Sequence, residues 1–309
     1  MRALLAGELR RLLSRRMIKV LALLALLGIA IGGVATFLKT EQTSEAVLRQ
    51  RRVAAEARVA DCVQGAQPPP GLALSPNGKG GPSAANQEEF CQFRFGRVPD
   101  RRLKLEKLEG VLQGLTAPLV IVAWVVGASS IGAELQARSI TTLLTWEPRR
   151  VRVMVVKVVA AVIVTWVFSL VTWALLSASL LPAVFVHGTT AGTDAAWWRS
   201  TVAVVARGEL MIAVATSVGF AVASIGRNTA AALGVGFAYF LVIENVVGNF
   251  LAGFRRWLLL GNAIVLISGK DSGGEVVGRS VLVAGLYLTG VAVTLLVVAT
   301  VLFGRRDIA

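Results

Sequence analysis

The feature that most constrains this chain is a set of six apolar stretches, each long enough to cross a lipid bilayer. They comprise residues 20–38, 115–133, 158–181, 201–226, 229–247 and 281–303. A helix of about 20 apolar residues spans a hydrocarbon layer roughly 30 Å thick, and a soluble domain does not need several such runs. Only 16% of the 309 residues are charged, against about 25% in typical soluble domains. We therefore predict an all-α integral membrane protein with six transmembrane helices.

The basic residues predict how these helices are oriented. A formal net charge of +14 would indicate a nucleic-acid partner in a soluble protein, but here most Lys and Arg residues lie in short segments beside apolar stretches. Fourteen of them fall in short segments on one side of the predicted membrane, and five, or six with Arg207, fall on the other. Because positively charged loops stay in the cytoplasm, we expect both termini to be cytoplasmic. We also expect membrane lipid as a partner and no nucleic acid.

Residues 1–19 form the first predicted element, an amphipathic helix that lies in the membrane interface. Six Lys and Arg residues occur in this segment, and four leucines lie near one helical face: Leu5, Leu9, Leu12 and Leu13. Such a helix binds the interface through its apolar face while its basic face contacts lipid headgroups. The alternative is a signal peptide, but the following stretch, 20–38, is too long for the apolar region of one and is predicted to be the first span.

Residues 39–114 separate the first two spans and are too long and too polar for a simple loop. We predict helices at 41–60, which is rich in Ala, Glu, Gln and Arg, and at 99–114. Residues 67–85 are dense in Pro, Gly, Ser and Asn and are predicted to be irregular. The predicted orientation makes 39–114 an extracellular helical insertion.

Cys62 and Cys91 are the only two cysteines of the chain, and they flank the irregular region. A pair of cysteines in a segment predicted to lie outside the cell favours a disulfide. The alternative is two free thiols, which would require a reducing compartment.

Residues 115–309 hold spans two to six, and the link between spans two and three is polar and short. Four apolar residues recur in it at roughly helical spacing: Ile140, Leu143, Leu144 and Trp146. Pro148 ends this pattern, and arginines lie on both sides of it. A short helix with an apolar face and basic flanks at the membrane surface is suited to bind a groove on a partner protein.

This link also resembles a known family. It resembles the corresponding link of six-helix ABC exporter permeases of type 2. The resemblance lies in the sequence GAE, followed by TTLL, then by Pro-Arg-Arg and by a Lys at the start of the next span. The residues that fall on the family's pattern are Gly132, Glu134, Thr141, Leu144, Pro148, Arg149 and Lys157.

The resemblance implies several features of function. Residues 134–150 would contain the coupling helix that docks on a separate ATPase subunit, and residues 1–19 would be the elbow helix. The expected coupling residues are Glu134, Arg138, Thr141, Thr142, Leu143, Leu144, Pro148, Arg149 and Arg150. ATP and magnesium would bind the ATPase partners and no cofactor would bind this chain. The second permease copy would be identical or paralogous, and the location would be the bacterial inner membrane.

Two pairs of polar residues interrupt the fourth and fifth apolar stretches: Arg207 with Glu209, and Glu244 with Asn245. Arg207 lies about 27 Å from the inner end of its stretch, at the outer interface, where an arginine can reach water. Glu244 and Asn245 lie in the outer third of theirs, where an acid is costly unless it faces protein or water. All four are candidate pathway or gate residues. The alternative for Glu244 is a structural ion pair with Arg207 or Arg255.

The last predicted feature of the membrane region is an outer re-entrant segment at 248–279. Its apolar run, 258–268, is too short to span a bilayer. Residues 281–303 then form the sixth span and return the chain to the cytoplasmic side.

Motifs of catalysis are not found in the sequence. A phosphate-binding loop is excluded because Gly78-Lys79 is followed by Gly80 and Gly269-Lys270 by Asp271. Residues 127–131 lack the last glycine of G-x-S-x-G, and His187 is the only histidine, so no metal site can be assembled. We therefore do not expect this chain to be an enzyme.

Two functions from different classes remain. The first is the permease subunit of an ABC exporter for an amphipathic, lipid-like or drug-like substrate, since the spans carry few charges. The second is a transporter, channel or scaffold that works without ATP, which would place polar residues along several spans at the midplane. The sparse polar residues of the spans favour the first.

Overall fold

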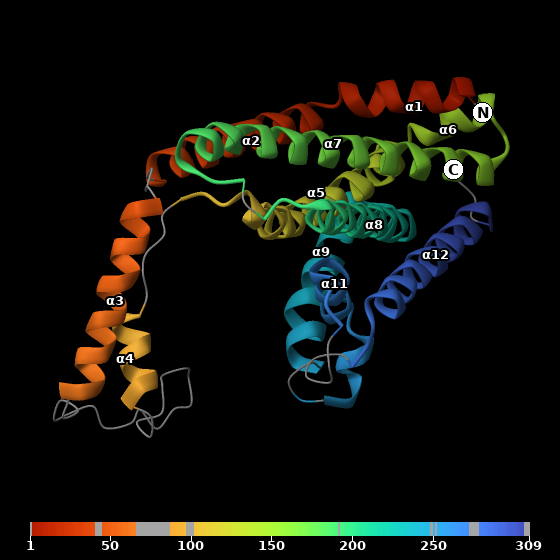
Figure 1. Ribbon diagram of the computed structural model, residues 1–309. Coiled ribbons are helices and arrows are strands. Elements are labelled where there is room, and N and C mark those ends of the chain that lie inside the picture. The colour runs from red at the N-terminus through yellow and green to blue at the C-terminus, as the bar shows by residue number, and fades with distance from the viewer. Residues whose placement is uncertain are drawn as a thin grey trace. The chain divides into compact units, whose positions relative to one another are not determined.

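The computed structural model describes residues 2–40, 45–65, 87–96, 102–190, 192–247, 250, 252–271 and 278–305. Among these, six helices are long and apolar enough to cross a membrane (Figure 1). They are α2 (Arg16–Lys39), α5 (Leu108–Gln136), α7 (Arg150–His187), α8 (Ala195–Gly226), α9 (Thr229–Ala238) continued by the π-helix η2 (Tyr239–Val247), and α12 (Val281–Arg305). The prediction of an all-α protein with six membrane-length helices is confirmed.

The chain divides into two compact units. The first unit comprises Met1–Gly32, Glu106–Ser179 and Gly192–Ala309, and the second comprises Gly33–Leu105 and Leu180–Ala191. The division falls within α2 and within α7, and each unit is described here by itself.

Helices α5 and α8 form the centre of the first unit. Their backbones approach closely at two glycines: a Cβ atom on Gly127 would overlap the carbonyl oxygen of Thr216, and one on Gly219 would overlap that of Trp124. Small residues at such contacts are how membrane helices gain packing energy, because lipid offers no hydrophobic drive for association.

One end of the first unit is a core to which most of its helices contribute. Its members come from the last turns of α5, α8 and α12 and from the start of α6 (Ile140–Trp146), α7 and α9: Ala128, Ile131, Ile140, Met154, Phe220, Ala221, Ala223, Ala232, Ala299 and Phe303. We call this the α6 end. It gathers the helix termini that the charge pattern predicts to face the cytoplasm.

Helix α1 (Arg2–Ser14) is shorter than the helix predicted at 1–19, because residues 16–19 already belong to α2. Leu12 is buried, and Leu5 and Leu9 pack with it against Ala160 and its neighbours on α7. Leu13 is 55% exposed, so the fourth leucine of the predicted face does not share this contact. At 100° per residue Leu13 lies at the edge of the face, and α7 is too narrow to cover it.

The opposite end of the first unit carries a short apolar helix, α11 (Leu259–Ser268), preceded by the 3-10 helix η3 (Ala252–Trp257). As predicted for this stretch, α11 is too short to span a bilayer. It packs against α12 and α8 through Ala263 and Leu266. We call this the α11 end.

The second unit contains a helical hairpin. Helices α3 (Glu45–Gly65) and α4 (Gln87–Phe95) lie side by side (Figure 1). A disulfide joins Cys62 to Cys91, with their Cα atoms 5.8 Å apart. The disulfide expected from the cysteine pair is therefore present. The segment predicted to be irregular, 67–85, lies outside the described residues.

Two predicted boundaries are wrong. The helix predicted at 99–114 does not stand alone, because α5 begins at Leu108 and runs directly into the predicted second span. Similarly, the third predicted span ends at residue 181, but α7 continues through Pro182 to His187. Long membrane helices tolerate an internal proline when neighbouring groups satisfy the freed carbonyl.

Candidate functional site

The link between α5 and α7 folds into the seven-residue helix α6, with the bounds that the apolar spacing predicts. Arg138 reverses the chain in a left-handed conformation with φ 54°. Ile140 then inserts into the core of the α6 end and is 1% exposed. The backbone N–H of Glu147 donates to the carbonyl of Leu143 and closes the last turn, and Pro148 prevents a further one.

Several residues in and directly after α6 are exposed. Trp146 is 86% exposed, Thr142, Pro148 and Arg149 are also exposed, and Leu143 is half-buried. The side chain of Leu144 lies outside the described residues. An exposed tryptophan beside a proline and an arginine is typical of a surface that a partner protein covers.

Two predicted coupling residues bond within the chain. The hydroxyl of Thr141 donates to the carbonyl of Arg138 at 2.7 Å and closes the turn before α6. A guanidinium nitrogen of Arg150 donates to the carbonyl of Gly304 at 3.3 Å. The last turn of α12 is thereby tied to the start of α7.

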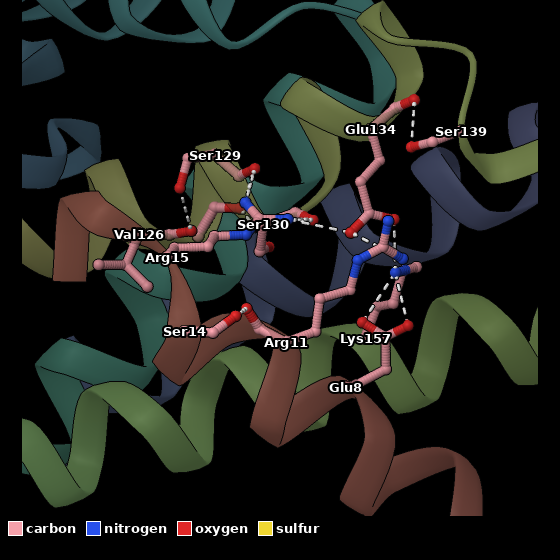
Figure 2. A network of polar contacts seen from close by, with 11 residues as sticks. Glu8, Arg11, Ser14, Arg15, Val126, Ser129, Ser130, Glu134, Ser139 and Lys157 are labelled. Carbon is pink, nitrogen blue, oxygen red and sulfur yellow. Dashed lines mark hydrogen bonds and ion pairs between the residues drawn. The ribbon is translucent and has the colours of Figure 1, made fainter. Parts of the chain in front are cut away.

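A buried ion cluster joins the ends of α5 and α7 that α6 connects (Figure 2). The Nζ of Lys157 contacts Glu134 Oε2 at 2.7 Å and both carboxylate oxygens of Glu8 at 2.8 Å. These side chains are between 1% and 7% exposed. Charges this deeply buried are tolerated only when they are paired and hydrogen-bonded.

Two arginines complete what we call the Glu134 cluster: Glu8, Arg11, Arg15, Glu134 and Lys157. Arg15 Nη2 lies 3.0 Å from Glu134 Oε1, and Arg15 Nη1 donates to the carbonyl of Ser129 at 2.6 Å. Arg11 Nη1 lies 3.6 Å from the same Glu134 oxygen and reaches solvent. Three cations therefore surround two acids, and the excess positive charge sits on the most exposed member.

The Glu134 cluster joins three helices and the link between α1 and α2 at one point. Glu8 belongs to α1, Arg15 lies between α1 and α2, Glu134 ends α5, and Lys157 begins α7. Glu134 and Lys157 flank α6 in the sequence. The cluster therefore ties α1, α5 and α7 together beside this link.

Sequence reasoning placed Glu134 in the site but missed Glu8, Arg11 and Arg15 as its partners. One signal was available: Glu8 is the only acid among the first 19 residues, and Lys157 is a cation next to a long apolar run. Lone charges in such settings require partners, but which partners depends on how α1 packs against α7.

The four polar residues of spans four and five lie apart. Glu209 accepts a hydrogen bond from the Ser169 hydroxyl of α7 at 2.7 Å. Arg207 lies against the C-terminal end of α11, where a Cβ atom on Gly269 would overlap its guanidinium group. Helix carbonyls favour a cation at that position. Arg207 and Glu209 therefore contact different helices: Arg207 contacts α11 and Glu209 contacts α7.

Glu244 lies at the other terminus of α11. Its Oε1 accepts the backbone N–H of Leu260 at 2.7 Å, and the hydroxyl of Tyr239 accepts that of Leu259 at 3.1 Å. A carboxylate at a helix N-terminus satisfies an otherwise unpaired donor and the helix dipole. Arg207 and Glu244 therefore lie about 15 Å apart along α11, and the ion pair with Arg207 that was the alternative for Glu244 is not formed.

Asn245 bonds within its own helix. Its side-chain amide donates to the carbonyl of Phe240 at 2.8 Å. This contact satisfies a backbone acceptor in the π-helical turns of η2.

The described residues contain no group of three His, Cys, Asp or Glu side chains that could hold a metal ion.

The fold and the site define a multi-pass membrane protein of the transporter class. The family described as ABC-2 family transporter protein matches residues 2–308, nearly the whole chain. The chain therefore belongs to the ABC-2 family of transporter proteins, whose members form the membrane component of a transporter. No curated protein and no solved structure matches the chain.

Proposed function

We propose that this chain is the permease subunit of an ATP-driven exporter in the bacterial inner membrane, and that separate ATPase subunits dock on α6. ATP and magnesium then bind the ATPase subunits, and this chain binds neither. Two permease copies, identical or paralogous, form the pathway. The family membership supports this assignment, and the observation that carries it is α6, with its exposed Trp146 in front and the buried Glu134 cluster behind.

The exposed side of α6 supports a protein partner of defined chemistry. Trp146 offers a large apolar surface, and Arg149 and Arg138 provide positive charge at its edges. A partner groove with an apolar floor and an acidic rim fits both features. The anchoring of Ile140 in the core keeps this surface in a fixed position.

The Glu134 cluster supports transmission of the partner's movement. Separating a buried ion pair costs several kcal/mol, so α1, α5 and α7 are expected to follow α6 as one body. Helix α5 in turn contacts α8 at Gly127 and Gly219. Movement at α6 would therefore reach the centre of the first unit.

The test is co-purification of this chain with its ATPase subunit and measurement of ATP hydrolysis. Trp146→Asp and Leu144→Asp place a charge in the proposed contact and should cost several kcal/mol of assembly. Arg305→Asp is the matched control, because it adds an acid at an exposed position of the same end. Normal co-purification and ATP hydrolysis in both α6 variants would exclude α6 as the docking helix. Transport by the wild type without ATP hydrolysis would favour the ATP-independent alternative.

A further inference from the structure

A large apolar pocket of the first unit lies between α5, α8, α9 and α12. It has a volume of about 600 Å³, within the range of small-molecule sites. Its walls include Trp124, Val218, Gly234, Phe237, Leu260 and Val291. Nearly all of this lining is apolar, so the pocket suits a hydrocarbon chain or ring system.

Two glycines of α9 keep the pocket open. A Cβ atom on Gly236 would come within 2.8 Å of the Trp124 ring, so α9 lies directly against that indole. A Cβ atom on Gly234 would meet nothing within 4 Å, although Gly234 lines the pocket. A larger residue at 234 would therefore project into space that the chain itself does not occupy.

Two polar side chains, Tyr239 and Glu244, contact the backbone at one end of the pocket. Leu259 and Leu260 line the pocket, and their backbone N–H groups bond to Tyr239 and Glu244. The Glu244 carboxylate is half-buried and one of its oxygens accepts the N–H of Leu260. A carboxylate retains further acceptor sites beyond this bond. An apolar pocket with a carboxylate next to one of its lining residues is complementary to an amphipathic cation.

We propose that this pocket binds the hydrocarbon part of a long-chain amine, with the ammonium group at Glu244. The inference rests on the proposed transport function and names the substrate class of that pathway. The ammonium supplies the opposite charge that a carboxylate in a membrane segment requires, whereas an anionic amphipath of the same length would be repelled. The same chemistry occurs in single-chain amines and in aminophospholipid headgroups.

Binding to the purified full-length chain in phosphatidylcholine nanodiscs tests this assignment without any ATPase. The probe is 9,10-dibromooctadecylamine, whose bromines quench tryptophan fluorescence, compared with the dibrominated octadecanol and octadecanoic acid. We expect the amine to half-saturate at a concentration roughly tenfold below that of the alcohol, and the acid to bind most weakly. Trp124→Phe should remove the saturable quenching, and Trp198→Phe, at an exposed position, should retain it.

Two variants distinguish binding of the probe's hydrocarbon chain from binding of its headgroup. Glu244→Gln keeps an acceptor for Leu260 and should erase the difference between amine and alcohol, whereas Glu109→Gln, a half-buried acid elsewhere, should not. Gly234→Leu should weaken all probes by about tenfold, whereas Gly290→Leu, which also meets open space, should not. If added phosphatidylethanolamine displaces the amine, the natural ligand is a membrane aminolipid. If it does not, the natural ligand is a single-chain amine.

Equal affinity for amine and acid, or unchanged binding in Gly234→Leu, would overturn the proposal. Because the ATPase takes no part, these results would leave the docking of α6 untouched. Conversely, failure of α6 docking would leave this binding measurement valid.

Discussion

The two ends of the first unit hold charge in opposite ways. At the α6 end, Glu134 and Lys157 are bonded to each other and to other charged side chains, out of contact with water. At the α11 end, Glu244 and Arg207 are held by the two termini of one short helix. Rearranging the α6 end would break several buried ion pairs. Rearranging the α11 end would break about one hydrogen bond. The comparison supports our proposal that the α6 end transmits movement as a rigid body, and it leads us to expect rearrangement at the α11 end.

The largest effect should come from breaking the Glu134 cluster. Lys157→Met leaves two buried carboxylates without their shared cation, and we expect a loss of roughly 3–5 kcal/mol in the free energy of unfolding. Denaturant unfolding of the purified chain measures this loss. Arg152→Met is the control, because its pair with Glu147 is partly exposed and should be worth less than about 1 kcal/mol. Equal losses in the two variants would remove the distinction between a buried cluster and an ordinary surface pair.

The disulfide should have the next largest effect, and it should affect neither end of the first unit. Replacing Cys62 and Cys91 by serine opens a loop with a sequence separation of 29, which is worth about 3–4 kcal/mol in the chain-entropy model. We expect faster proteolysis between α3 and α4 with unchanged co-purification of the ATPase.

Thiol labelling tests where the disulfide lies. Intact cells should label only after reduction, because both cysteines are predicted to be oxidised and outside. Labelling without reductant would contradict the disulfide, and labelling only after lysis would contradict the orientation.

A smaller effect on stability, but a clear effect on function, is expected at Glu244. Glu244→Gln retains an acceptor for the N–H of Leu260, so the free energy of unfolding should change by less than about 1 kcal/mol. The corresponding Glu134→Gln should cost more, because it leaves Lys157 and Arg15 short of negative charge. If Glu244 is also a gate residue, the Gln variant should express and assemble normally while its basal ATP hydrolysis or transport changes. Unchanged activity in a well-folded Gln variant would exclude the gate.

Local patterns predicted the spans and α6, and tertiary contacts determined the rest. The bounds of α6 follow from apolar spacing and Pro148, which are properties of neighbouring residues. The predicted break before the second span was wrong because Gly114 does not end a helix whose apolar face continues from Leu112. The partners of Glu134 could not be predicted, since Glu8 and Arg15 reach it only through the packing of α1 on α7. Likewise, the sequence indicated that Glu244 needs a polar partner but could not show that α11 returns to it.

The central claim is that the Glu134 cluster transmits docking at α6 to the membrane helices, and Glu8→Gln tests it most directly. This change weakens the ion pair between α1 and Lys157 and leaves the exposed face of α6 intact. The measurement is the rate of ATP hydrolysis by the complex relative to the ATPase subunit alone, alongside co-purification. The account predicts that the ATPase still co-purifies while the permease-dependent change in hydrolysis falls severalfold. Full co-purification with the wild-type hydrolysis ratio would contradict it.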